Sequence, residues 1–270
     1  MIEYEWSFDP FVAIPLALSG GLYATGVARL WARAGIGESV KRWQAACFAA
    51  GWLSLLAALV TPLHELGEHL FTAHMIEHEV LMAVAAPLLA LSRPIGAFLY
   101  ALPRTWRHWL SRSAGAGWIS VPWGWLTRPL DATILHGAAI WIWHTPALFD
   151  ATVTNETMHR LQHASFLVTA LFFWWAIFRR ARRDYGLGAI HVAATMVHTS
   201  ILGALIALSP GLLYVVQTKD APAFGLTPLE DQQLGGLIMW VPAGTLYAAV
   251  ALVLVGLWIS APNRRPSYAK

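Results

Sequence analysis

Long apolar runs alternate with short polar segments along most of this chain. A helix needs about 20 mostly apolar residues to cross a hydrocarbon layer about 30 Å thick. Scanning at that length predicts seven such helices, near residues 10–30, 43–61, 71–91, 130–149, 159–178, 189–209 and 235–260. The pattern therefore predicts an all-α membrane protein, a seven-transmembrane-helix bundle that forms one domain over residues 1–270.

Composition supports membrane lipid as the main surrounding medium. The chain is 57% hydrophobic and 12% charged, whereas soluble domains carry roughly 25% charged residues. Many of the 15 tryptophans stand at the ends of apolar runs, where an amphipathic ring suits the headgroup level. The single cysteine, Cys47, excludes a disulfide framework and a site made of cysteines alone.

Charge alternates from one connecting segment to the next. All but two of the 18 Lys and Arg residues fall in segments 29–42, 92–129, 179–184 and the C-terminal tail, and acidic residues fill the other connections. Positive loops face the cytoplasm, so we predict an N-terminus outside and a C-terminus in the cytoplasm. We therefore attribute the net charge of +3 to loops that face an anionic lipid leaflet, and not to binding of nucleic acid. Proline and glycine in segment 92–129 favour short interfacial helices there.

Histidines are the main ionisable residues within the predicted spans. His74 and His78 on the third helix are four residues apart and project from one face, and His159 and His163 repeat the spacing on the fifth. His144 stands near the end of the fourth helix, just before a proline that should end or kink it. Helix direction places these imidazoles about 10 Å below the outer surface, so we expect them to converge.

Paired imidazoles suit copper, zinc or iron. Met75, Met158 and Met82 are nearby candidates for thioether ligands, which would favour Cu(I). Ionisable groups at membrane depth are usually functional. The alternative is that the histidines only fix helix packing through hydrogen bonds, with Glu77, Glu79, Thr145 or Asn155 as partners.

Several other polar residues are secondary candidates. His64 and His69, with Glu65 and Glu68, form an outer loop that either captures a metal cation or is a solvated turn. His198 should lie near the middle of the membrane and His136 deeper, where a structural role is the simpler reading of each. Asp231 opens the seventh helix, and capping of that helix explains it without a ligand role. Gly235 and Gly236 should permit close helix approach.

Several motifs resemble those of the CtaG family of caa3-type cytochrome c oxidase assembly factors, from about residue 60 to 260. In order they are His74–His78, Ala86–Leu89, Trp141–Phe149, His159–Phe166, Phe173–Trp175 and Asp231–Trp240. The resemblance implies a multi-pass protein of the bacterial inner membrane that assists haem-copper oxidase biogenesis. It implies a metallochaperone that helps copper reach the CuB centre, with cytochrome c oxidase subunit I and other assembly factors as partners. The motif histidines, His74, His78, His144, His159 and His163, carry over as the metal-binding residues.

Two other classes fit the histidine pattern. Paired histidines on facing helices can hold haem axially in a redox protein. His-x-x-x-His boxes also occur in di-metal membrane oxygenases, whose boxes face the cytoplasm, opposite to the side predicted here. We favour the assembly factor, which is not an enzyme, with copper as its metal and zinc or haem as alternatives.

Overall fold

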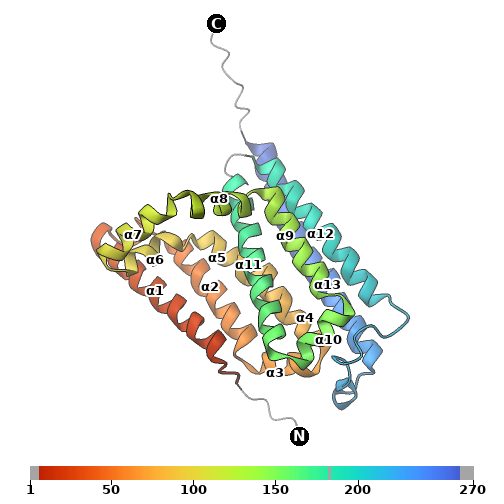
Figure 1. Ribbon diagram of the computed structural model, residues 1–270. Coiled ribbons are helices and arrows are strands. Elements are labelled where there is room, and N and C mark those ends of the chain that lie inside the picture. The colour runs from red at the N-terminus through yellow and green to blue at the C-terminus, as the bar shows by residue number, and fades with distance from the viewer. Residues whose placement is uncertain (1–5, 182–183, 262–270) are drawn as a thin grey trace.

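The computed structural model describes residues 6–181 and 184–261, and over those ranges it is entirely helical with connecting turns and loops (Figure 1). The elements are α1 (Pro10–Ala34), α2 (Arg42–Leu59), α3 (Pro62–His69), α4 (Phe71–Glu79), a π-helical segment (Val80–Ala85), α5 (Ala86–Ser92), α6 (Ile95–Ala101), α7 (Arg104–Ala114), α8 (Gly117–Leu126), α9 (Pro129–Trp143), α10 (Pro146–Thr154), α11 (Glu156–Ala181), α12 (Tyr185–Ala207), a 3₁₀ turn (Ala221–Phe224) and α13 (Pro228–Ser260). The predicted charges at Glu3, Glu5, Arg182, Arg183 and the tail lie outside the described residues.

Within the described ranges, five helical segments are long and apolar enough to cross a membrane, in agreement with a transmembrane protein. They are α1, the continuous run Phe71–Ser92, α11, α12 and α13. A sixth arises if α2 and α3, which meet at a bend of 47°, count as one broken span. α9 has 15 residues and is therefore only about 22 Å long. The count of seven spans stays a prediction.

The predicted fourth helix, 130–149, is interrupted at His144. α9 ends at Trp143, and Pro146 is the first residue of α10. Proline has no backbone N–H, and it pushes the residue before it into extended backbone. Thr145 has φ −67° and ψ 132°, so the expectation that the proline ends the helix is confirmed.

Different segments of the chain form the two ends of the bundle (Figure 1). The 92–129 segment forms the short helices α6, α7 and α8, as expected, and these lie at the end opposite α3 and α10. At that end Arg29 Nη1 donates to the carbonyl oxygen of Ala101 at 2.5 Å. Which end faces the cytoplasm stays a prediction from charge.

The π-helical segment leaves one backbone carbonyl without a hydrogen-bond donor from its own helix. The N–H of Ala86 bonds to the carbonyl of Leu81, five residues back, so the carbonyl of Met82 would need the N–H of residue 87. That residue is Pro87, which has none. Trp174 of α11 supplies the missing donor, because its indole Nε1–H lies 2.9 Å from Met82 O.

α12 and α13 pack along each other at glycines, as Figure 1 shows. A Cβ added to Gly236 would lie 2.5 Å from Ala207 N, and one added to Gly203 would lie 2.8 Å from Trp240 N. Gly235 similarly faces the ring of Phe71 on α4. The expected role of Gly235 and Gly236 in close helix approach is confirmed.

Candidate metal centre

The helix that carries the first histidine pair is fixed at its start by a distant carboxylate. Leu70 is extended, which leaves the first N–H groups of α4 without helical partners. Asp231 Oδ2 accepts from Phe71 N at 2.8 Å, and Oδ1 accepts from Thr72 N at 2.9 Å. The prediction that Asp231 caps its own helix is wrong, because Thr227 caps α13. Asp231 instead caps α4.

Two histidine pairs face each other across α4 and α11. The ring centroids of His74 and His159 are 5.1 Å apart, and those of His78 and His163 are 5.2 Å apart. His144, at the end of α9, lies 5.9 Å from His78. The structure thus brings all five motif histidines together, and each has a largely buried side chain.

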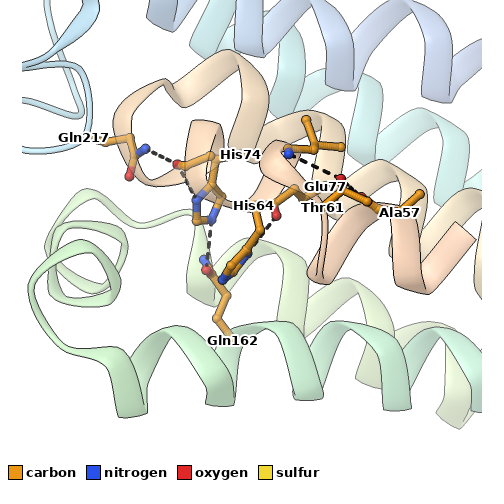
Figure 2. A network of polar contacts seen from close by, with 9 residues as sticks. Ala57, Thr61, His64, His74, Glu77, Gln162 and Gln217 are labelled. Atoms are coloured by element: carbon orange, nitrogen blue, oxygen red, sulfur yellow. Dashed lines mark hydrogen bonds and ion pairs between the residues drawn. The ribbon is translucent and has the colours of Figure 1, made fainter. Parts of the chain in front are cut away.

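α3 contributes a sixth imidazole. The predicted outer loop is a helix, because Thr61 caps its first turn and a proline begins it. His64 points inward from α3, with its ring 5.3 Å from His159 and 6.0 Å from His163. Its Nδ1 lies 2.9 Å from Glu77 Oε1 (Figure 2). A Cβ on Gly67 would overlap the Glu77 carboxylate, so glycine lets α3 lie directly on α4.

Two glutamines that the sequence interpretation did not single out orient His74 (Figure 2). His74 Nδ1 lies 3.3 Å from the Gly67 carbonyl, which also accepts from Gln217 Nε2 at 2.7 Å. A carbonyl only accepts, so Nδ1 carries the proton and Nε2 a lone pair. Gln162 lies 3.2 Å from Nε2 through its Oε1, while its own Nε2 has no partner among the described residues. Turning this amide by 180° lets its Nε2–H donate to His74 Nε2.

His144 is held in a similar way. Its Nδ1 lies 2.7 Å from the carbonyl oxygen of Ile140, which assigns the proton to Nδ1. Tyr214, in the loop before α13, donates its hydroxyl to the carbonyl of His144 at 2.8 Å. Phe166 packs edge-on against His78 at 4.7 Å and is fully buried, so it borders the cluster at a position three residues after His163 on α11.

Several buried ligand atoms of this cluster lack a hydrogen-bond partner within residues 6–181 and 184–261. These atoms are both ring nitrogens of His78, Nε2 of His144, His159 and His163, and Oε2 of Glu77. Burying polar atoms without partners is costly. Unprotonated imidazole nitrogens are also the form that binds transition metals, so the atoms left without partners fit a metal ion.

In the part of the chain that the structure describes, three groups of side chains bring their ligand atoms within 4.8 Å of one another. Two nitrogens bound to one ion at about 2.0 Å each would stand about 3.3 Å apart, so small side-chain shifts suffice. The groups are His64, His159 and His163; His74, His78 and His163; and His74, Glu77 and His159.

The remaining candidates lie apart from these groups. His69 Nδ1 is 2.9 Å from Asp220 Oδ2 at the surface, and His198 Nδ1 accepts from Trp141 Nε1 at 3.4 Å. Both oxygens of Asp231 are used in capping α4. Met75 faces Gly235 of α13, and Met158 packs beside the large apolar core.

The expected structural partners of the histidines are only partly found. Glu77 does hydrogen-bond a histidine, His64. The other partners of the cluster are Gln162 and backbone carbonyls. Gln162 could have been found from its position three residues after His159, on the same helix face. His136, outside the cluster, bonds Thr169 Oγ1 at 3.1 Å.

Fold and site together define a helical transmembrane protein with a buried cluster of imidazoles near one end of its bundle. The family model for cytochrome c oxidase caa3 assembly factors matches residues 21–261. The chain belongs to this family, and the resemblance of its motifs is confirmed.

Similar chains occur in mycobacteria. The proteins Mb0105 of Mycobacterium bovis and MT0111 of Mycobacterium tuberculosis are each 28% identical to this chain over 289 residues. ML1998 of Mycobacterium leprae is 25% identical over 283 residues. All three are described only as uncharacterized proteins, and each match covers 96% of this chain. The chain spans about two-fifths of their length, 40% in each case. No solved structure matches it.

Proposed function

We propose that this protein binds Cu(I) through the imidazole cluster and passes it to a haem-copper oxidase during maturation of the CuB centre. The copper is cargo, held by His74, His78, His144, His159 and His163 with His64 at the outer side. The proposed location is the bacterial inner membrane, with the cluster toward the outer face. The proposed receiving partner is subunit I of cytochrome c oxidase, with other assembly factors assisting.

The observation that carries this proposal is the set of buried imidazole nitrogens without partners. Nitrogen ligands of this kind bind copper, zinc or iron. The group His74, His78 and His163 is buried and carries no carboxylate. A low-dielectric site with neutral ligands favours the ion of lower charge, which supports Cu(I) over Zn²⁺.

Metal analysis of the purified full chain tests the proposal. After anaerobic loading with Cu(I) and removal of free metal, we expect mass spectrometry to find about one or two bound copper ions. Alanine at His78 or His163 should remove them, whereas His198→Ala is the matched control because that imidazole lies outside the cluster. Unchanged copper in both cluster variants would overturn the proposal.

The same sample tests the two other classes. Haem would give a Soret band in the visible spectrum of the purified protein. The imidazoles on the facing helices lie close together, with centroids 5.1 Å apart for His74–His159 and 5.2 Å apart for His78–His163, which does not favour a porphyrin between them. A cysteine introduced at position 65 or 156 reports sidedness, and labelling from the cytoplasm would favour the oxygenase class.

A further inference from the structure

The three groups of ligand atoms form an overlapping series. We call His64, His159 and His163 the outer triad, and His74, His78 and His163 the inner triad. They share His163. The third group, His74, Glu77 and His159, takes one histidine from each triad and adds a carboxylate.

We infer that the outer and inner triads are two successive positions of one copper ion, which moves between them by exchanging ligands around His163. This inference rests on the proposed function. A neutral imidazole has one nitrogen lone pair available for a metal ion, so His163 serves only one triad at a time. Occupation of the two positions through this residue is therefore mutually exclusive.

Burial gives the order of the two positions. The outer triad includes His64, whose side chain is 14% exposed and sits on the short helix α3 at the end of the bundle. All three residues of the inner triad are buried. A cation arriving from water therefore meets His64 and His159 before it meets His78.

The third group provides the step between the two positions. His159 and His74 face each other with their rings at 22° and 5.1 Å. Glu77 supplies the carboxylate of this group. Its Oε1 lies toward His64, and its Oε2 has no partner in the described part of the chain. A cation can thus pass from His159 to His74 while a carboxylate balances its charge.

The amide of Gln162 hinders the last step, in which the ion reaches His74 in the inner triad. It covers Nε2 of His74, the nitrogen whose lone pair is available. Gln162 must release that nitrogen before His74 can bind an ion through it. Arrival at the inner triad therefore needs a side-chain rotation that the outer triad does not.

Uptake and release kinetics of Cu(I) in the full chain in detergent test the inference. The probe is Cu(I) itself, with bathocuproine disulfonate as a water-soluble chelator that strips accessible copper. We expect His64→Ala to slow uptake at least tenfold but to retain bound copper that the chelator removes slowly. His78→Ala should take up copper at the original rate into the outer triad but lose it to the chelator at least tenfold faster, so that little copper stays bound once free metal has been removed.

Matched variants keep the result interpretable. His163→Ala should lose both positions, and His198→Ala should behave as the original chain. His64→Gln and His78→Gln repeat the two tests in case an alanine variant does not fold, as judged by size-exclusion chromatography. Identical effects of the His64 and His78 variants on both rates would mean one position and would overturn the inference. Absence of copper from the original chain would instead overturn the proposed function.

Discussion

Asp231 and Phe71 are 160 residues apart in sequence, yet the Asp231 carboxylate accepts the backbone N–H of Phe71 at 2.8 Å. The same carboxylate binds the next N–H, that of Thr72, so one side chain from α13 satisfies the start of α4. The first of these bonds is buried. α4 carries His74 and His78, and its position in the bundle is therefore set from the opposite end of the chain.

Asp231→Asn should destabilise the protein by about 1–3 kcal/mol. Asparagine has one acceptor oxygen where aspartate has two, so one N–H of α4 loses its partner in a buried place. The apparent melting temperature in detergent measures the loss. Glu38→Asn at an exposed turn is the control and should leave the melting temperature nearly unchanged. Equal melting temperatures for the two variants would refute the capping role.

Trp174→Phe should destabilise the protein by about 1–3 kcal/mol, because it leaves the buried Met82 carbonyl without a donor. Trp175→Phe is a closely matched control. The indole N–H of Trp175 is buried without a partner among residues 6–181 and 184–261, so its removal should cost much less. The comparison uses thermal unfolding of both variants, and a larger loss at Trp175 would contradict our account of the π-helical segment.

Gly236→Ala should separate α12 from α13 and cost about 1–3 kcal/mol, since the new Cβ would meet backbone atoms of Ala207. Gly256→Ala lies on the same helix and meets no described atom within 4 Å. Alanine there should be neutral or slightly stabilising, because it is the better helix former. Unfolding curves measured in SDS compare the two variants. Similar curves for both would show that the close helix approach at Gly236 is unimportant for stability.

Tyr214→Phe should destabilise the protein by about 1 kcal/mol through loss of the hydrogen bond to His144 O. Burial and the nearby Asp150 carboxylate raise the pKa of the Tyr214 hydroxyl above its ordinary value. In the unfolded chain the tyrosine ionises near pH 10. The contribution of this hydroxyl to the free energy of unfolding is therefore complete below about pH 10 and decreases above it. Melting temperatures from pH 8 to 11 should converge for the two proteins, and parallel curves would contradict this assignment.

The sequence predicts those features of the structure that are determined within a single helix. Apolar length locates most helices, and the four-residue spacing places His74 with His78 and His159 with His163 on single faces. It does not predict contacts between segments far apart, such as the capping of α4 by Asp231. Tyr214 and Gln217 escape notice because loop residues have no periodicity. His64 is only a secondary candidate from sequence, as part of an outer loop, because α3 has only eight residues, too few to show a clear apolar face.

The aromatic ring of Phe166 bears on ion leakage across the membrane. It lies against His78 and is fully buried, three residues further along α11 than His163. A bare or partly hydrated cation gains nothing from crossing such a ring when polar ligands lie behind it. A cation held by His78 therefore leaves on the side from which it came, or sideways to a partner embedded in the same bilayer. Under the proposed function, the protein would offer copper to another membrane protein without becoming a conduit that dissipates ion gradients.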